Sequence, residues 1–478
     1  MRTILLAVRD LSPEAFLVGG AIRDALTGRS YPVDLDLIVK GDGFHVARTL
    51  VDRLPHEATF VPLDAERGAG RIVVRRGEAI VDISSLQGDS LAEDLRKRDF
   101  TINALAVKLE DLLNSGIERL IDPMDGRLDL QRGKLRACSA QTFDDDPVRM
   151  IRAFRFQAEL GFEICHTTLE MIRSAAQGVQ HAAPERIRDE LVGVFRAKQC
   201  EYSLRDMDRC GILGSLFPEL VAMKGVGQNE YHHLDVWDHS IEAVRQLEIL
   251  LEDQATTFGD AALTVRAYVD EELVRGRPRS ALLKFAALFH DTGKPHCISR
   301  DPDGRVRFLG HEKISREIFE QAGRRLKLAN REIHVIGEWI GGHMRPMILT
   351  GSTVSKRALY RLHRTFGVDV IGLLLLFLAD LGASSGPARP ENIRAHALAQ
   401  TNRAMKALIE SAQEPQQPLL NGHDIMRMFG LTPGPFLGRV VKRLAELEGS
   451  GEVRTREEAV GAVRHYIGTA RREQEEHH

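Results

Sequence analysis

The sequence has few cysteines and no pattern that would join them. Its five cysteines are an odd number, and no two of them form a C-x-x-C pair. They are Cys138, Cys165, Cys200, Cys210 and Cys297. This spacing argues against a disulfide framework and against a structural zinc site, and it favours a reducing compartment.

Long apolar runs are also missing. The first residues offer only Ile4–Val8, which is too short for the apolar region of a signal peptide. The longest apolar stretch, Val370–Ala379, covers about half of a membrane span and is followed by Asp380, so we interpret it as a buried helix. We therefore expect a soluble, cytoplasmic protein without a membrane partner.

No excess of one charge marks the chain. The 478 residues carry 65 Lys and Arg against 68 Asp and Glu, a net charge of −3, which excludes a uniformly basic nucleic-acid coat. A neutral total can still contain a local basic path. The length predicts two to four domains at roughly 100–200 residues each.

Short β-rich runs are confined to the start of the chain. Alternating apolar residues predict strands at Phe16–Val18, Leu35–Val39, Arg71–Val74 and Ala79–Ile83. From Asp146 onward the pattern is almost continuously helical. The sequence therefore predicts a mixed α and β domain followed by mostly helical ones.

Two glycines and two aspartates in the first 40 residues carry the strongest chemical signal. Gly19 and Gly20 join a strand to a helix, where the backbone can approach a phosphate closely, and Arg23 can add a charged fork. Asp34 and Asp36 share one strand face, as required to hold a pair of Mg²⁺ ions on a triphosphate. Alone, the two patterns are typical of an ordinary turn and a solvated strand face. Together at this spacing they indicate a nucleotide site.

These residues carry a family resemblance. The segment 17–29 with Asp34 and Asp36 resembles the catalytic signature of the class II tRNA nucleotidyltransferase (CCA-adding enzyme) and bacterial poly(A) polymerase family. Blocks similar to further motifs of that family follow in order at 97–106, 120–126 and 145–156. The resemblance implies an α+β head like that of DNA polymerase β, with a small mixed sheet. It also implies two-metal, in-line transfer of nucleotides of the 3′-terminal CCA from CTP and/or ATP to tRNA.

The resemblance also implies roles for individual residues. Asp34 and Asp36 would be catalytic and hold Mg²⁺. Asp146 and Arg149 would present the hydrogen-bonding edge that selects C or A, on a helix that we expect to begin at Pro147 with Asp146 as its cap. The nucleotide-binding residues it implies are Gly19, Gly20, Arg23, Arg98, Asp99, Asp146, Arg149 and Arg152.

The product is left open by the sequence. Only 14 residues separate Ile83 from Arg98, whereas enzymes that build all of CCA usually have a longer loop there. In this respect the chain resembles family members that add only CC. One alternative is a poly(A) polymerase or A-adding enzyme of the same family. Another is an HD phosphohydrolase with a degenerate transferase head. Asp82 is either a third carboxylate of the site or a structural residue.

Histidines concentrate in the middle of the chain, where eight of the 18 lie between positions 232 and 343. Their order resembles the HD phosphohydrolase superfamily, in which imidazole and carboxylate ligands hold a divalent metal that activates water. We expect Ni²⁺, Mn²⁺ or Mg²⁺ there. The predicted ligands are His239, His290, Asp291 and Asp380, with His311 and His343 as further candidates. We interpret His232, His233 and His296 as structural or peripheral.

The C-terminal segment 430–438 resembles the last block of the same family. Free amides at the following helix, together with Arg439, Lys442 and Arg443, would suit a tRNA backbone, although a simple helix cap explains the glycines equally well. We predict a nucleotidyltransferase head at 1–140, a helical RNA-binding neck at 141–225, an HD domain at 226–385 and a helical RNA-binding tail at 386–478. The sequence does not indicate an oligomeric state.

Overall fold

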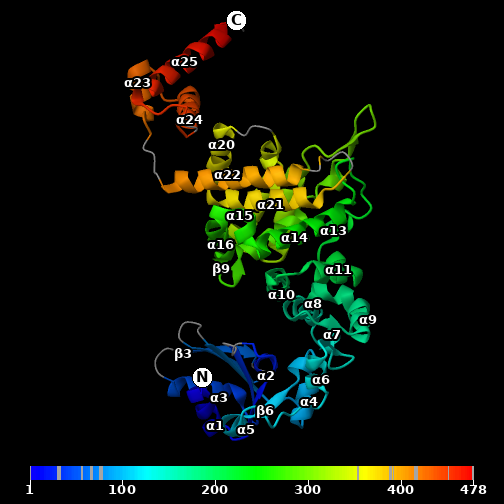
Figure 1. Cartoon of the computed structure of the whole chain (residues 1–478). Coiled ribbons are helices and arrows are strands. Elements are labelled where there is room, and N and C mark those ends of the chain that lie inside the picture. Colours follow the sequence, from blue (N-terminus) through cyan, green and yellow to red (C-terminus); the bar gives the residue numbers. More distant parts are fainter. Residues whose placement is uncertain are drawn as a thin grey trace. The chain divides into compact units, whose positions relative to one another are not determined.

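The computed structural model describes residues 2–29, 34–54, 58–64, 68–74, 79–351, 355–386, 390, 392–413, 418–449 and 452–475. The chain folds into two units (Figure 1). The first comprises Met1–Ala197 and Tyr202–Leu216, and the second comprises Lys198–Glu201 and Phe217–His478.

A six-stranded mixed sheet forms the start of the first unit, in the order β3-β4-β5-β2-β1-β6. Its strands are β1 (Ala15–Val18), β2 (Asp34–Val39), β3 (Ala58–Asp64), β4 (Ala69–Val74), β5 (Ala79–Ser85) and β6 (Ala106–Lys108). Strands β2 and β5 pair in parallel, and the other neighbours pair antiparallel.

One face of the sheet is covered by apolar packing against α1 (Arg2–Leu11), α3 (Gly43–Arg53) and α5 (Leu109–Ser115) (Figure 1). Leu35, Leu37 and Val39 of β2 enter this core. Because side chains alternate along a strand, Asp34 and Asp36 lie on the opposite, accessible face. The buried half of β2 thus fixes the direction of its carboxylates.

Helices make up most of the remainder of the first unit. They are α2 (Gly20–Leu26), α4 (Leu91–Arg96), α6 (Gly126–Gln131), α7 (Thr142–Asp145), α8 (Arg149–Leu160), α9 (His166–Ala175), α10 (Pro184–Arg196), α11 (Glu201–Arg209) and α12 (Ile212–Leu216). A two-stranded sheet pairs β7 (Lys134–Leu135) with β8 (Glu163–Ile164).

A tight turn before α6 explains the motif at 120–126. The carboxylate of Asp122 accepts hydrogen bonds from the backbone N–H groups of Gly126 (2.7 Å) and Arg127 (2.9 Å). A Cβ on Gly126 would lie 2.0 Å from the carbonyl oxygen of Thr101. Only glycine permits this approach, which holds the segment η2 (Thr101–Asn103) in place beside the nucleotide motif.

The start of α8 differs from the sequence-based expectation. We expected a helix from Pro147 capped by Asp146, but α8 begins at Arg149 with Val148 as its N-cap. The backbone N–H of Arg149 donates to Asp146 O, and that of Met150 donates to Pro147 O, both at 3.1 Å. These bonds span three residues, so the first turn is a tight turn and not yet α-helix.

The second unit is almost entirely helical. Its helices are α13 (Pro218–Val221), α14 (Val236–Glu252), α15 (Gln254–Phe258), α16 (Ala262–Asp270), α17 (Arg279–Phe289), α18 (His311–Arg325), α19 (Asn330–Gly342), α20 (Lys356–Phe366), α21 (Val370–Ala383), α22 (Ile393–Gln413), α23 (Gly422–Phe429), α24 (Pro435–Gly449) and α25 (Arg456–Glu475). Two hairpins pair β9 (Glu272–Val274) with β10 (Arg277–Pro278) and β11 (Ser299–Arg300) with β12 (Val306–Arg307). The predicted fold class, an α+β head before a mostly helical remainder, is confirmed.

The apolar stretch at Val370–Ala379 is a buried helix, as expected. It lies in α21, which packs against α14, α17, α19 and α22. Within the described residues, one helical stretch, Arg357–Ala383, is long and apolar enough to span a membrane, and 72% of its most apolar window is buried inside the protein. This burial is that of the core helix of a globular protein.

Gly372 allows α21 to pack closely on α19. A Cβ at this position would lie 2.5 Å from the ring of Trp339, which is fully buried and donates from Nε1 to Asp369 O at 3.0 Å. We predict that Gly372→Ala lowers the free energy of unfolding by about 1–3 kcal/mol, because the ring cannot move aside. The control is Gly461→Ala in α25, where no described atom beyond the neighbouring backbone of that helix lies within 4 Å of the added Cβ. Equal unfolding free energies of the two variants in chemical denaturation would contradict the prediction.

Candidate functional site

Three carboxylates gather on the accessible face of the sheet. Asp34 and Asp36 lie on β2, and Asp82 of β5 is the parallel register partner of Asp36. Arg71 Nε and Nη2 donate to the two oxygens of Asp82, each at 2.8 Å. The structure thus places Asp82 beside the predicted pair, held by Arg71, and its role stays a prediction.

The glycine turn lies directly against the carboxylate of Asp36. Gly19 has a φ of 77°, which glycine adopts without strain, and it precedes α2. A Cβ on Gly19 would lie 3.0 Å from Asp36 Oδ2 and 3.1 Å from Arg98 Nη1. A carboxylate, a guanidinium and an approachable backbone therefore converge at one point.

The two aspartates are short of positive charge. Loss of surrounding water raises the pKa of both Asp34 and Asp36. Arg71 lowers the pKa of Asp34, and Arg98 lowers that of Asp36, but neither effect is large enough to cancel the rise. Each is raised further by its carboxylate neighbours. This donor set fits Mg²⁺, which proteins bind through one or two carboxylates together with substrate phosphates.

A chain of polar contacts joins the other predicted nucleotide residues. Arg23 Nη1 donates to Asn103 Oδ1 at 2.8 Å, and Asn103 Nδ2 donates to Asp99 Oδ1 at 3.1 Å. Arg152 Nη1 donates to Asp99 Oδ2 at 3.2 Å, and its Nε donates to Glu190 Oε1 at 2.7 Å. The predicted phosphate and ribose residues are therefore held in one network.

This network sets the charge of Asp99. Burial alone would raise the pKa of Asp99, but Arg152 and the hydrogen bonds from Asn103 and from its neighbouring backbone N–H hold that pKa below its usual value. Asp99 is thus an ionised acceptor in a fixed orientation. It suits a ligand hydroxyl, which donates to such an acceptor.

Residues 97–99 connect the three predicted motifs. The carbonyl oxygen of Lys97 accepts a hydrogen bond from Arg149 Nη2 at 3.0 Å. Arg98 faces Gly19 and the carboxylate pair, and Asp99 binds Arg152. Three consecutive residues thus join the metal face to the helix that carries Arg149.

The predicted base-reading pair has a partner that sequence reasoning missed. Arg186 of α10 donates from Nη1 and Nη2 to Asp146 Oδ1 (3.1 Å) and Oδ2 (2.7 Å). Arg149 Nε lies 3.7 Å from Asp146 Oδ2. Arg186 and Glu190 stand four residues apart and share one face of α10, but nothing in the sequence links that face to Asp146 or Arg152.

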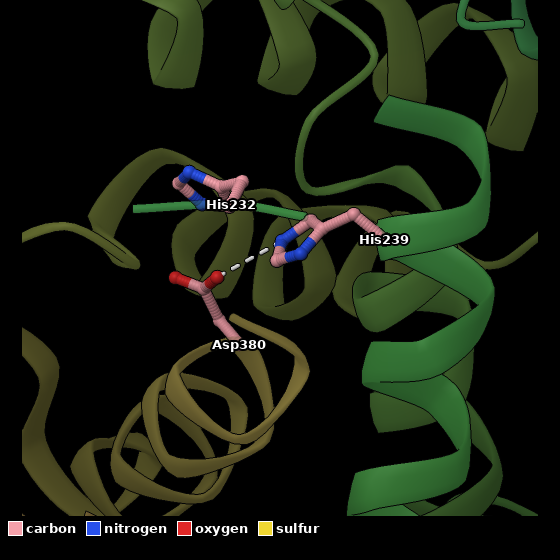
Figure 2. A group of neighbouring side chains, drawn as sticks. All are labelled: His232, His239 and Asp380. Atoms are coloured by element: carbon pink, nitrogen blue, oxygen red, sulfur yellow. Dashed lines mark ion pairs between the residues drawn. The ribbon is translucent and has the colours of Figure 1, made fainter. Parts of the chain in front are cut away.

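The structure brings the predicted residues of the histidine cluster together from distant segments of the second unit. One group of possible ligand atoms comes from His239, His290 and Asp291, and a second comes from Asp291, His311 and His343. Within each group, the ligand atoms all lie within 4.8 Å of one another. A third comprises His232, His239 and Asp380 (Figure 2). His232, which we interpreted as structural or peripheral, therefore lies in the cluster.

The histidine rings are oriented by second hydrogen bonds. Nδ1 of His290, His311 and His343 lies 2.8, 2.7 and 2.7 Å from the carbonyl oxygen three residues earlier. A donating Nδ1–H leaves the Nε2 lone pair for a metal, the usual arrangement of histidine ligands. His311 Nε2 and His343 Nε2 lie only 3.2 Å apart, and a cation would relieve the repulsion of two such lone pairs.

Asp291 stands between two sets of ligand atoms. Its Oδ1 lies 3.2 Å from His311 Nε2, and its Oδ2 lies 3.2 Å from His290 Nε2 and 3.4 Å from His239 Nε2. Among the described residues, Asp291 Oδ1 and His290 Nε2 are buried without a hydrogen bond. These atoms fit a site that would hold one or two divalent metal ions.

The charges of the cluster favour metal binding. Burial opposes charge, but His290 and its neighbours hold the pKa of Asp291 well below its usual value, and His239 and His290 do so for Asp380. Burial favours a neutral ring, yet Asp291 and Asp380 raise the pKa of His290 to about 10. Burial and the charges of His290 and His311 lower the pKa of His343 to about 3. Asp291 and Asp380 are therefore held as anions by His290 and, for Asp291, by Lys294, and a divalent cation would take the place of the proton on His290.

The predicted RNA-contacting residues lie on α24. Arg439 and Lys442 are exposed, and the guanidinium of Arg439 lies over the Phe436 ring at 5.4 Å. Arg443 lies 3.7 Å from Glu446, to which Arg357 and Arg361 of α20 also bind. The RNA-binding role of α24 stays a prediction.

Family models match three parts of the chain. "Poly A polymerase head domain" matches residues 15–136, "Probable RNA and SrmB- binding site of polymerase A" matches residues 161–223, and "HD domain" matches residues 236–394. The first match contains the carboxylate pair, and the last contains the histidines from His239 to His343 and Asp380.

Two curated relatives are similar over nearly the whole length. The A-adding tRNA nucleotidyltransferase of Deinococcus radiodurans is 35% identical over 461 residues, covering 95% of this chain and 96% of the relative. The CC-adding tRNA nucleotidyltransferase of Thermus thermophilus is 32% identical over 462 residues, covering 95% and 94%.

Solved structures share the fold. The Thermotoga maritima CCA-adding enzyme complexed with tRNA has a TM-score of 0.63 at 21% identity, covering 97% of this chain and 95% of that chain. A CCA-adding enzyme in complex with ATP has a TM-score of 0.64 at 22% identity, with the same coverage.

Proposed function

Because the chain belongs to the family of tRNA nucleotidyltransferases and bacterial poly(A) polymerases, we propose that it adds nucleotides of the 3′-terminal CCA to tRNA in the cytoplasm, using CTP and/or ATP. The observation that carries this proposal is the convergence of Gly19, Asp36 and Arg98 beside Asp34 on one face of the sheet. No intact transferase site is expected in a dedicated phosphohydrolase with a degenerate head.

Each part of the site has a task in this reaction. When bound at Asp34 and Asp36, Mg²⁺ would supply Lewis-acid activation of the tRNA 3′-hydroxyl and neutralise the triphosphate. The backbone at Gly19 admits the phosphates, and Arg98 adds charge where negative charge develops. Asp99 accepts from the ribose of the incoming nucleotide.

Base selection is assigned to the start of α8. The carboxylate of Asp146 accepts hydrogen bonds and the guanidinium of Arg149 donates them, so together they can match the edge of a base. Arg149 is braced by the carbonyl oxygens of Lys97 (3.0 Å) and Thr142 (3.3 Å), which fixes the direction of its remaining donors.

CC addition from CTP is the product that the structure favours. The 14 residues between Ile83 and Arg98 complete β5, form a short turn and enter α4. Asp94 Oδ2 accepts from the N–H of Gln87 at 2.8 Å, and Glu93 Oε2 accepts from the N–H of Asp89 at 3.0 Å. This connection is short and internally hydrogen-bonded, which supports a catalytic cycle without a long flexible loop.

A-addition is the second candidate, because the Deinococcus radiodurans relative at 35% identity is an A-adding enzyme. The deciding experiment incubates tRNAs ending before CCA, after C and after CC with CTP, ATP or both, and resolves the products at single-nucleotide length. We expect two additions from CTP and none from ATP. One A added to the tRNA ending in CC would establish the second candidate, and long A tails would establish a poly(A) polymerase.

Arg186 is predicted to position Asp146. Replacing Arg186 by Ala removes the paired hydrogen bonds to both oxygens of Asp146 and leaves the weaker contacts of Val148 N–H (3.4 Å) and Arg149 Nε (3.7 Å). A small misplacement of a reading group can cost up to about a hundredfold, so we expect kcat/KM for CTP to fall ten- to a hundredfold. Arg186→Lys should not restore it, because an ammonium cannot make the paired bond. The control is Glu185→Ala, which changes a neighbouring exposed residue. The role would be contradicted if Arg186→Ala matched wild type both in the CTP rate and in the ratio of kcat/KM for CTP to that for ATP.

We further propose a metal-dependent phosphohydrolase activity at the histidine cluster. When bound, a divalent metal such as Ni²⁺, Mn²⁺ or Mg²⁺ would lower the pKa of a water molecule. The supporting observation is the pair of ligand sets on either side of Asp291. We also propose that the neck at 141–225 and the tail, through Arg439, Lys442 and Arg443, contact the tRNA backbone.

A further inference from the structure

His232 lies on a fixed loop that precedes α14. Its backbone N–H donates to Asn229 O at 3.0 Å, and Gly386, beyond the end of α21, donates to Tyr231 O at 2.9 Å. A Cβ on Gly386 would lie 2.2–2.4 Å from backbone atoms of residues 230–232, so the loop presses against a position where only glycine fits. The loop is therefore held at the end of α21, the helix that bears Asp380.

The ring of His232 is oriented like those of the other histidines in the cluster. Its Nδ1 lies 2.9 Å from Asn229 Oδ1, again an oxygen three residues earlier. Because the amide oxygen can only accept, the ring donates from Nδ1 and keeps a lone pair on Nε2. This second hydrogen bond is the arrangement expected of a metal ligand.

His232, His239 and Asp380 point toward one another from the loop, α14 and α21 (Figure 2). Their candidate ligand atoms all lie within 4.8 Å of one another, and His239 Nε2 lies 3.0 Å from Asp380 Oδ1. The ring of His239 is fully buried, and within the described part of the chain neither of its nitrogens has a hydrogen-bond partner. A buried imidazole whose nitrogens make no hydrogen bond, beside a carboxylate and a second imidazole, fits a cation-binding site.

We propose that His232 is a metal ligand, and that with His239 and Asp380 it holds a divalent transition-metal ion at the more exposed end of the histidine cluster. Two imidazoles and one carboxylate suit Ni²⁺, Zn²⁺ or Mn²⁺ better than Ca²⁺. The inference rests on the metal site proposed above and extends it by a ligand that is not among those predicted from the sequence. His232 and Asp380 are only partly buried, whereas His290 and Asp291 are fully enclosed, so this ion is the one most open to a substrate phosphate.

The test compares His232→Ala with its neighbour His233→Ala, an exposed histidine on the same loop. The full-length protein is stripped with a chelator, titrated with Ni²⁺ by calorimetry and analysed for retained nickel after desalting. We expect His232→Ala to bind the weakest equivalent of Ni²⁺ at least about tenfold less tightly, and His233→Ala to match wild type. The thermal midpoint of the chelated proteins shows that the variants are folded.

A second measurement does not depend on any variant. Crystals of the wild-type protein soaked in Ni²⁺ should show anomalous scattering within bonding distance of His232 Nε2. Superimposable titrations of wild type and His232→Ala, or anomalous peaks confined to the atoms around Asp291, would overturn the inference. If wild type binds no Ni²⁺, Mn²⁺ or Zn²⁺ at all, the metal site itself has failed, a result distinct from failure of His232 alone.

Discussion

Replacing Asp36 by Asn is expected to abolish nucleotide addition and leave tRNA binding intact. The change keeps the size of the side chain but removes the carboxylate that faces the turn at Gly19, one of the two on the accessible face of β2. Loss of one charge-stabilising group typically costs a hundred- to a thousandfold, so with the metal also lost we expect at least about a thousandfold fall in the single-turnover rate. Gel-resolved incorporation of labelled CTP measures the rate, and a filter-binding assay measures tRNA affinity.

Asp34→Asn should behave in the same way, and retained incorporation by both variants would rule out the assignment.

Although it abolishes activity, Asp36→Asn is expected to stabilise the metal-free protein. The pKa of Asp36 is raised in the folded protein, so ionisation of its carboxylate costs stability; this cost grows as the pH rises above the ordinary value of 3.8 and is complete above the raised pKa. Metal-free Asp36→Asn should therefore unfold at a higher temperature than wild type at pH 7, and the difference should shrink as the pH falls through the raised pKa and vanish below 3.8.

Asp291→Asn is expected to remove the phosphohydrolase activity. Asp291 Oδ1 faces His311 Nε2, and Asp291 Oδ2 faces His290 Nε2. Replacing this carboxylate by an amide therefore weakens metal binding in both ligand sets. We expect hydrolysis of p-nitrophenyl phosphate with Ni²⁺ or Mg²⁺ to fall at least about a thousandfold, since metal-bound water supplies the nucleophile at neutral pH. CTP incorporation by the same variant should stay within about twofold of wild type.

The two active-site variants serve as controls for each other. Asp36→Asn should retain phosphohydrolysis, and Asp291→Asn should retain nucleotide addition. If hydrolysis persists in Asp291→Asn and in a His290→Ala, Asp291→Ala double variant, the metal assignment is wrong. Loss of both activities in either variant, with folding intact, would mean that the two sites are not separate.

The sequence predicted the interior of the sheet better than its edge. β2 and β5 have regular apolar alternation because one face packs on α1 and α3. β3 has no such pattern, since most of its side chains are at least partly exposed and it contains Pro62, and it lies at the edge of the sheet. The prediction that α8 begins at Pro147 is also wrong, because a proline is favoured at the start of a helix and equally before a tight turn.

The catalytic carboxylates could be anticipated because they lie within one short strand and obey its period of two. Arg186 could not, since it joins Asp146 from 40 positions away and no local rule connects the two residues. His232 was set aside for a related reason: it lies on a loop, where no periodicity fixes the direction of a side chain. Its role becomes visible only when Gly386 brings that loop against the end of α21.

Lys294 gives the histidine cluster an ammonium of its own. Its Nζ lies 2.5 Å from Asp291 Oδ2 and 2.6 Å from Gln228 Oε1. An enclosed carboxylate is therefore already neutralised by a side chain before any metal arrives. Structural zinc modules unfold on chelation because metal binding supplies their folding free energy. This domain, in contrast, should keep its fold through repeated loading and stripping, so that its metal content can follow supply in the cell without loss of the protein.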